Sequence, residues 1–480
     1  MGFAIKTQDH NPPRNKYMTP MVPLAMFGWP PLAIWLFARF RHRPRLAVIA
    51  GFLLAWMFLP NYGYKLPALP DYTKISAACF GILLGAAIFD PAVFRRFRLR
   101  GWDAPLLVWT LVPFLTSLSN GLGAYDGVSA ALGRFTQWGI PYFLGRLYFN
   151  RREALEDLLL GFFIGTLVYI PFCWFEIVMS PRLHRIVYGF HPHSFAQAKR
   201  SGGWRPVIFM QHGLMNSMWM VSGFVAGFSL LISRRLGRRL PGPLPAWTAA
   251  IAVLFVTIIL LKSTGALFLL LLGTLVLMVF RTLRTALPLV LLLAIPLTYA
   301  TVRSTGLWDG THLIEAAASA ANAERTGSLA FRIENETILA GHALKRPLLG
   351  WGEWGRSFVR DEEGRIVSVP DGLWILAFGK SGYVGLSALL LLFFVPPLLF
   401  LRRYPPATWK DPAVAAVLAG PLLLALFALD SLMNDMFNPL MLLLAGGLTG
   451  LWLQDDPGDT NDVSGMSPPA PVQATGPRLI

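Results

Sequence analysis

The sequence predicts an all-α, polytopic integral membrane protein with about 12 (12–13) transmembrane helices and a large helical periplasmic loop. Of the 480 residues, 54% are hydrophobic and only 14% are charged. The hydrophobic residues gather in repeated runs close to the ~20 residues that a helix needs to cross a bilayer. Short clusters of lysine and arginine separate many of these runs, as they do beside membrane spans. These observations exclude a soluble globular protein.

The predicted spans follow the apolar runs in chain order. Pro30 and Pro31 interrupt the first run and basic residues precede it, so its orientation stays open and about twelve spans are expected. Cys79 and Cys173 both fall inside runs, where we expect them to pack as small hydrophobic residues. The runs cover 23–38, 46–60, 74–89, 104–119, 128–145, 158–178, 207–232, 246–262, 264–280, 286–301, 373–400, 412–430 and 437–453.

Basic clusters orient these spans, because short cytoplasmic loops are enriched in lysine and arginine. This orientation puts 179–206 and 302–372 on the outer face, which is the periplasm in a bacterium. It also divides 246–280 into two helices at the polar break 262–265. The clusters predicted to be cytoplasmic are 39–43, 95–98, 146–152, 233–239, 281–284 and 402–403.

The predicted organisation has five parts and no second soluble domain. An N-terminal tail (1–22) leads into a transmembrane bundle (23–301), which includes the basic outer loop 179–206. A periplasmic loop (302–372) and the C-terminal transmembrane helices (373–453) follow. The tail 454–480 is rich in Asp, Pro and Ser, so we expect it to be disordered and cytoplasmic.

The basic outer loop contradicts the rule that external loops avoid positive charge. No Asp or Glu occurs from Val178 through Trp308. A phosphate-bearing lipid is one cause, because guanidinium donors match phosphate oxygens. Nonspecific anchoring to acidic headgroups and a locally reversed orientation are the alternatives. The basic residues of the loop are Arg182, His184, Arg185, His191, His193, Lys199, Arg200 and Arg205.

The loop leads directly into a predicted helix that carries polar residues near its outer end. Gln211, His212 and Asn216 lie there, where polar side chains are costly unless they face a cavity or a partner helix. We therefore expect all three to line a groove. For His212 a hydrogen-bonded contact between helices is an equal alternative.

The segment from Thr326 to Gly385 is the one long stretch between apolar runs that carries mixed charge. Apolar residues at helical spacing, Leu329, Ile333, Ala340 and Leu344, predict a surface helix that ends before Pro347. A glycine-rich turn, an extramembrane loop and a return into the membrane are expected to follow. The turn reads Arg-Pro-Leu-Leu-Gly-Trp-Gly over 346–352, and the return begins Asp-Gly-Leu-Trp at 371–374.

This order of features resembles the O-antigen ligase and polysaccharide polymerase superfamily of bacterial membrane glycosyltransferases. The matching pieces are Ser328 and Arg332, the turn 347–352, and the Gly-Lys-Ser-Gly-Tyr-Val-Gly run at 379–385. The resemblance implies an undecaprenyl-diphosphate-linked oligosaccharide donor, a glycan or lipid A core acceptor, and no metal or nucleotide cofactor. It also makes Arg200 or Arg205 the counterpart of a diphosphate-binding arginine.

The chain departs from the superfamily where a functional histidine usually opens the next membrane helix. Asp371 and Gly372 stand there instead. A carboxylate at this point could act as general base on a sugar hydroxyl, with His212 as the second candidate. The alternative is that Asp371 caps the helix that begins at Leu373, a role that Asp fills well and that is compatible with catalysis.

For the remaining candidate residues the sequence allows both a functional and a structural role. Arg332 could bind phosphate or sugar, or pair with Glu336 one helical turn away. Asp430 and Asn434 share a helical face and could bind acceptor hydroxyls, although a solvated turn is the commoner explanation. No histidine forms a metal-ligand spacing, so no metal site is expected.

The predicted function is therefore transfer or polymerisation of oligosaccharide from a lipid diphosphate donor at the bacterial inner membrane. Exopolysaccharide or O-antigen polymerases and O-antigen ligases both fit, and the missing histidine favours a polymerase. A lipid or polysaccharide transporter and a catalytically inactive relative are the alternatives. The net charge of +16 does not indicate a nucleic-acid partner, because most of it lies in short loops beside the spans, where membrane lipids are the neighbours.

Overall fold

The computed structural model describes residues 18–66, 70–200, 202–320 and 323–454. Most of the predicted N-terminal tail and the predicted disordered tail after Gln454 lie outside the described residues. The α-helices are α1 (Met21–Arg39), α2 (Pro44–Phe58), α3 (Lys74–Phe89), α4 (Ala92–Arg95), α5 (Ala104–Ser119), α6 (Ala124–Arg134), α7 (Ile140–Tyr148), α8 (Arg152–Met179), α9 (Leu183–Tyr188), α10 (Gly213–Ile232), α11 (Leu236–Arg239), α12 (Leu244–Leu260), α13 (Thr264–Leu283), α14 (Leu287–Ser304), α15 (Thr311–Ala320), α16 (Ala323–Ala343), α17 (Leu373–Arg403), α18 (Pro412–Val417), α19 (Ala419–Asp430) and α20 (Pro439–Leu453).

The other regular elements are short. A π-helical turn, η2 (Phe135–Gly139), joins α6 to α7, so the predicted run 128–145 forms one continuous helical segment. Three short 3₁₀ helices and two small antiparallel hairpins complete the described chain. These are η1 (Gly101–Asp103), η3 (Phe195–Ala198) and η4 (Pro406–Lys410), with β1 (Gly63–Tyr64) paired to β2 (Tyr72–Thr73) and β3 (Lys199–Arg200) paired to β4 (Gly203–Trp204).

The all-α membrane fold is confirmed at the level of its helices. In the described part of the chain, seven helices are long and apolar enough to cross a membrane: Met21–Arg39, Arg152–Met179, Gly213–Ile232, Thr264–Leu283, Leu287–Ser304, Leu373–Arg403 and Pro412–Asp430. Four shorter apolar helices, α2, α3, α12 and α20, accompany them. The predicted total of about twelve spans, like the sidedness of the loops, stays a prediction.

One predicted helix boundary is confirmed and another is wrong. The break at 262–265 is confirmed, because α12 ends at Leu260, Lys262 takes a left-handed φ of 54° and α13 begins at Thr264. The run 207–232 is wrong at its start, because the helix begins only at Gly213. Before it, Ile208 has a positive φ of 56°, and the backbone N–H groups of Val207 and Ile208 donate to Glu176 of α8, both at 2.8 Å.

Small residues allow the closest helix contacts in the bundle. The pair α7 and α20 packs so tightly that a side chain at Gly446 would collide with the Tyr142 carbonyl oxygen at 1.9 Å. A side chain at Gly145 would meet the Leu443 carbonyl oxygen at 2.2 Å. Glycine at both positions lets the two backbones approach, as is common between membrane helices.

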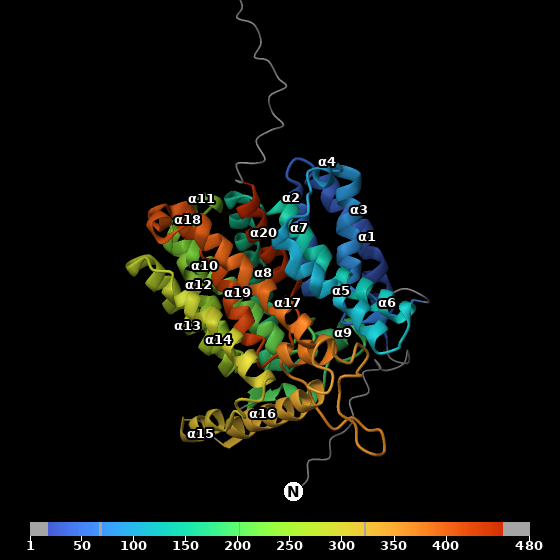
Figure 1. Ribbon diagram of the computed structural model, residues 1–480. Coiled ribbons are helices and arrows are strands. Elements are labelled where there is room, and N and C mark those ends of the chain that lie inside the picture. The colour runs from blue at the N-terminus through green and yellow to red at the C-terminus, as the bar shows by residue number, and fades with distance from the viewer. Residues whose placement is uncertain (1–17, 67–69, 201, 321–322, 455–480) are drawn as a thin grey trace, which may run out of the picture.

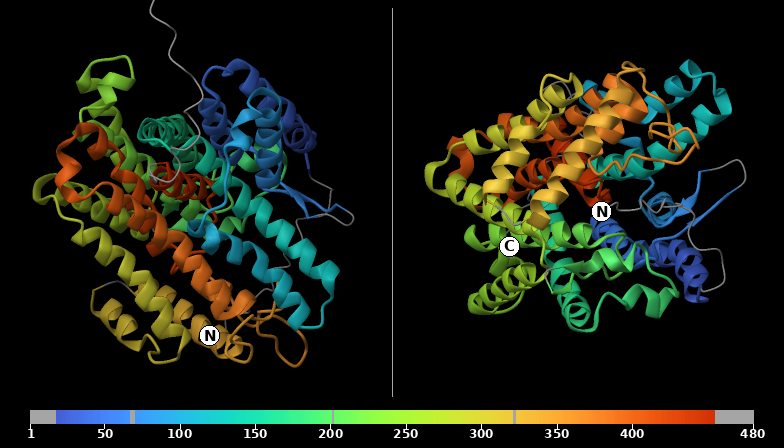
Figure 2. Two further views of the ribbon diagram at one scale, coloured as in Figure 1. Left: turned by 45° about the horizontal axis from the view of Figure 1, so that its top comes forward. Right: turned by 90° about the horizontal axis from the view of Figure 1, so that it is seen from below.

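The helix ends define two opposite faces of the molecule. The helices α15 and α16 lie across one face, and α4, α11 and α18 lie at the opposite one (Figure 1). The right-hand view of Figure 2 shows α15 and α16 covering their face of the bundle. The basic outer loop 179–206 reaches the same face, and we call it the α16 face.

A buried carboxylate anchors α16 on the bundle. Glu336 is 2% exposed and accepts hydrogen bonds from the Tyr299 hydroxyl at 2.7 Å and from the Trp374 indole at 3.1 Å. Arg303 of α14 lies 3.5 Å from the same carboxylate. Burial raises the pKa of Glu336, while these three partners oppose the rise. Helix α16 is thereby held against both α14 and α17.

Candidate functional site

The α16 face brings Arg332 near two arginines of one hairpin, Arg200 and Arg205, which come much earlier in the sequence. Arg200 ends strand β3, Arg205 follows strand β4, and Arg332 lies in α16. The positive charges of Arg200 and Arg332 both lower the pKa of Arg205, so the three arginines lie within electrostatic range of one another. We call Arg200, Arg205 and Arg332 the arginine cluster.

Arg205 is the most buried member of the cluster. Its side chain is 8% exposed and donates through Nη2 to the Lys262 carbonyl oxygen at 3.3 Å, in the break between α12 and α13. Burial and the other two arginines lower the pKa of Arg205 to about 10, so it remains a cation at neutral pH. A buried cation held beside like charges is a favourable place for an anionic ligand.

His212 lies beside the cluster and caps the helix that follows it. It is the N-cap of α10, and its Nδ1 accepts the Leu214 backbone N–H at 3.1 Å. Burial, the neighbouring His193 and the arginine cluster lower the pKa of His212 to about 3. In the neutral ring Nδ1 is the acceptor, so Nε2 carries the proton and is a donor. His212 is thus placed to donate a hydrogen bond, and not to accept a proton as the predicted base.

Arg332 connects the cluster to two carboxylates. Its Nε lies 3.2 Å from Oδ2 of Asp371, and its charge also acts on Asp430 at the end of α19. The alternative pairing of Arg332 with Glu336 is wrong, because Glu336 points into the bundle and bonds to α14 and α17. Proximity in space, and not helical spacing, selects the partner of Arg332.

Asp371 precedes α17 but does not cap it. The N-cap of α17 is Gly372, which makes no side-chain capping bond, so the capping role predicted for Asp371 is wrong. Burial raises the pKa of Asp371, and the nearby Arg332 opposes the rise. A partly buried carboxylate with a raised pKa suits a general base.

The remaining predicted site residues divide into one pair and two single positions. Asn434 donates to Asp430 at 2.8 Å, so the two side chains meet as expected, but Asn434 lies beyond the end of α19 and the predicted helical face is wrong. Gln211 is exposed in the turn before His212, and neither residue belongs to α10 as predicted. Asn216 is fully buried and donates to the Pro206 carbonyl oxygen at 3.3 Å. The predicted position of Asn216 on a groove is therefore wrong, since its amide holds the loop that carries Arg205.

Helix α17 is broken at Gly382. This residue has φ +60° and ψ −161°, a conformation that L side chains rarely adopt. A break of this kind leaves backbone groups without their partners one turn away, and at membrane depth these groups need new partners. The turn 347–352 supplies them.

The hydrogen bonds between the turn and the broken helix run in both directions. Trp351 and Gly352 donate their N–H groups to the carbonyls of Gly379 and Lys380, at 2.9 and 3.0 Å. In return, the N–H groups of Tyr383 and Val384 donate to the carbonyls of Pro347 and Leu348, at 2.7 and 3.2 Å. The two glycine-containing motifs of the sequence are thus one structural unit.

A cavity of about 520 Å³ lies next to this unit. Its charged centre is Glu353, which pairs with Arg134 of α6 and with Lys380 of α17, the latter at 2.9 Å. Burial would raise the pKa of Glu353, but Lys380 and Arg134 outweigh it and lower the pKa to about 2. Arg134 also donates to the Ser381 hydroxyl at 2.9 Å and lies 4.1 Å from the Trp109 ring centroid. We call this space the Glu353 cavity.

Two segments that line the Glu353 cavity also lead to residues that interact with Arg332. Leu373 lines the cavity two residues after Asp371, and Asp435 lines it one residue after Asn434, the partner of Asp430. Burial raises the pKa of Asp435, while Lys380 opposes the rise. The cavity is large enough and polar enough to hold a sugar unit.

Sequence reasoning missed Arg134, Glu353, Lys380 and Asp435. One signal could have found two of them, because Glu353 follows the glycine turn and Lys380 lies inside the glycine run that the turn contacts. Arg134 had no such signal in its helix. Among the described residues, no three His, Cys, Asp or Glu side chains lie together as a metal site.

Comparison with known proteins adds no relative. No protein-family model matches the chain, and no curated protein matches it in sequence.

Proposed function

We propose that the protein is a membrane glycosyltransferase that takes an oligosaccharide from an undecaprenyl-diphosphate-linked donor on the periplasmic face. The product would be an extended exopolysaccharide or O-antigen, or a glycan transferred to a lipid A core. The observation that carries this proposal is that Arg200 and Arg332 act on the buried Arg205 while Arg332 also pairs with Asp371. The chain motifs that resemble the superfamily supply the substrate class.

The arginine cluster would act on the leaving group. As the bond from the anomeric carbon to the donor diphosphate oxygen breaks, its electron pair goes to the diphosphate. Charge then grows on oxygens that Arg205 and Arg332 are placed to bind, which is electrostatic stabilisation of the transition state. His212 would donate its Nε2–H to the same anion.

Asp371 would act on the acceptor. It takes the proton of an acceptor sugar hydroxyl while the hydroxyl oxygen forms the new bond to the anomeric carbon. The ion pair with Arg332 holds the carboxylate beside the diphosphate, so the two reacting groups are oriented by one side chain. Asp430, paired with Asn434, is placed to bind further sugar hydroxyls.

A transporter is the second candidate, and the broken helix α17 favours it. Discontinuous helices at membrane depth often form the substrate sites of transporters. In this chain the turn 347–352 fills the break with backbone hydrogen bonds, which supports a fixed scaffold more than a moving gate.

The test is glycan extension by the purified protein in liposomes that contain undecaprenyl-diphosphate-linked repeat units. Wild type is expected to make a ladder of longer glycans, or to modify a lipid A core acceptor. Arg205→Ala removes the buried cation, and we expect a loss of about 100-fold in rate. Arg185→Ala is the matched control, because Arg185 is an exposed arginine of the same loop outside the cluster.

A further variant separates the two roles of His212. His212→Asn keeps a good N-cap for α10 but removes the Nε2 donor. We expect slower extension with unchanged stability. If no glycan is extended with either acceptor while the lipid-linked substrate crosses the membrane unchanged in length, transport replaces the enzyme proposal.

A further inference from the structure

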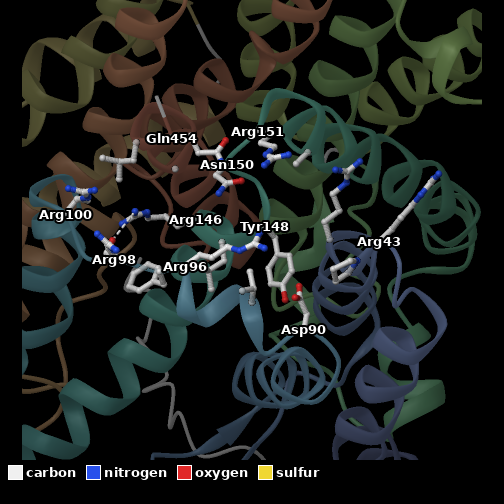
Figure 3. Close-up of a pocket in the computed structure, with 18 of the residues that line it drawn as sticks. Arg43, Asp90, Arg96, Arg98, Arg100, Arg146, Tyr148, Asn150, Arg151 and Gln454 are labelled. Carbon is white, nitrogen blue, oxygen red and sulfur yellow. Dashed lines mark hydrogen bonds between the residues drawn. The ribbon is translucent and has the colours of Figure 1, made fainter. Parts of the chain in front are cut away.

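A second and larger cavity, of about 1000 Å³, opens on the face opposite to α16. It lies among helix ends, between the connections α1–α2, α3–α5 and α7–α8 and the end of α20 (Figure 3). Asp90 is the one acidic residue among those that line it. Its arginines are Arg43, Arg45, Arg96, Arg98, Arg100, Arg146 and Arg151, and we call it the basic cavity.

Two of these arginines are neutralised by carboxylates of the bundle. Arg45 lies 2.6 Å from Asp157 of α8, and Arg146 pairs with Asp103. Arg146 is only 9% exposed and also donates to the Arg98 carbonyl oxygen at 3.4 Å. These pairs build part of the walls of the cavity.

Four further arginines bring charge without compensation. Within the described ranges of the chain, Arg43, Arg96, Arg98 and Arg151 have no ion-pair partner, and all four are exposed. They come from three separate connections and surround one opening (Figure 3). The positive-inside rule explains arginines on a cytoplasmic face, but not their gathering around a cavity. Several guanidinium groups around one space suit a phosphate group.

Two helix N-termini add to the positive potential. Arg43 is the N-cap of α2 and Arg151 the N-cap of α8, and neither makes a side-chain capping bond. Ser, Thr, Asp and Asn are the usual residues there, because the first N–H groups of a helix need acceptors and carry partial positive charge. Arginine at both positions increases that charge. An anion in the basic cavity would lie near both termini.

The surroundings favour a lipid as the source of the anion. Between the α3 end and α5, arginines are interspersed with apolar side chains, and Leu99 and Trp102 are 56% and 38% exposed. Tryptophan is enriched where a bilayer meets water. Exposed apolar residues beside Arg98 would lie among acyl chains while the arginine reaches the headgroup.

We propose that the basic cavity binds the phosphate headgroup of an anionic membrane phospholipid, with Arg96, Arg98 and Arg151 as its contacts. The site lies at the predicted cytoplasmic ends of the spans, across the molecule from the arginine cluster. It is independent of the glycosyltransferase proposal, since a transporter with the same fold would bind the same lipid.

The experiment titrates full-length detergent-solubilised protein with phosphatidylglycerol or phosphatidylcholine and counts bound lipid by native mass spectrometry. Wild type should bind one phosphatidylglycerol with clear preference. The variant Arg96→Ala/Arg98→Ala/Arg151→Ala should bind it about 100-fold more weakly, at about 1 kcal/mol for each arginine. The control Arg41→Ala/Arg95→Ala/Arg402→Ala loses the same charge at exposed positions outside the cavity and should bind as wild type does.

Four outcomes would overturn the proposal. Equal loss in the control triple would reduce the effect to nonspecific surface charge, and equal binding of phosphatidylcholine would show that the cavity does not select an anionic lipid. Displacement of the lipid by inorganic phosphate at equal concentration would make the ligand a soluble anion. The tail residues Asp455, Asp456, Asp459 and Asp462 are a competing occupant, because they follow Gln454 of the cavity in the sequence. Lipid binding that appears only after all four are changed to Asn would assign the cavity to the tail.

Discussion

The Arg332 guanidinium of α16 lies 3.2 Å from the Asp371 carboxylate, which stands at the entrance of α17. This pair joins the helix that covers the α16 face to the segment where the chain returns into the bundle. In the proposed reaction it would also join the two chemical roles, with Arg332 binding the diphosphate and Asp371 the acceptor.

The pair should show coupled effects on activity. We expect Arg332→Ala and Asp371→Asn each to slow glycan extension by about 100-fold. Because the two side chains are in contact, the double variant should lose less than the product of the single effects. Initial rates in liposomes measure this. Arg365→Ala is the control, since Arg365 pairs only with Asp361 and Glu363 on the exposed loop. Wild-type rates in both single variants would remove the pair from the reaction.

The pH profile should report the ionisation of Asp371. A general base must be deprotonated, so activity should rise with pH through the pKa of Asp371 and then level off. Burial raises this pKa and Arg332 opposes the rise. In Arg332→Lys the positive charge stays and the inflection should hold, whereas in Arg332→Ala it should move to higher pH. His212 adds no inflection near neutrality, because its pKa is about 3. An inflection that stays in place in Arg332→Ala would contradict the assignment.

Gly382 should tolerate no side chain. A Cβ there would lie 2.3 Å from the Leu348 carbonyl group, and the φ of +60° disfavours any L residue. We expect Gly382→Ala to lower the free energy of unfolding by about 3 kcal/mol or more, measured by thermal unfolding in detergent. Gly341→Ala is the matched control, since its Cβ would meet open space in α16 and alanine favours a helix by about 1 kcal/mol. Equal stability of the two variants would mean that the turn 347–352 is not tightly docked.

The Glu353 ion pairs should stabilise the fold above acidic pH. Its folded pKa of about 2 lies below the ordinary 4.5, so the unfolded chain binds more protons between these values. The contribution of Glu353 to the free energy of unfolding is therefore full above pH 4.5 and is lost as the pH falls to about 2. Glu353→Gln leaves Arg134 and Lys380 without their carboxylate partner and should lower the free energy of unfolding by about 3 kcal/mol near neutrality.

The control for this charge network is Glu363→Gln. Glu363 is 64% exposed and pairs with Arg365, so its loss should change stability by no more than about 0.5 kcal/mol. If Glu353→Gln changes stability as little as Glu363→Gln does, then water in the cavity, and not the carboxylate, accepts the hydrogen bonds of Arg134 and Lys380.

Much of this protein follows from the sequence alone. Hydrophobic runs of helical length predict the bundle, and the polar break at Lys262 predicts the end of one helix and the start of the next. The excess of arginine in an outer loop points to Arg200 and Arg205 without any structure. The helical predictions succeed because hydropathy is a property of each segment by itself, whereas the role of the two arginines stays a prediction.

Only the tertiary structure decided which of these residues meet. Helical spacing pairs Arg332 with Glu336, but the fold turns Glu336 into the bundle and brings Asp371 to Arg332. The same holds for Arg134, which pairs with Glu353, 219 residues away in the sequence. A partner is selected by where two elements pack, and that depends on the whole bundle, so no local pattern in the sequence contains it.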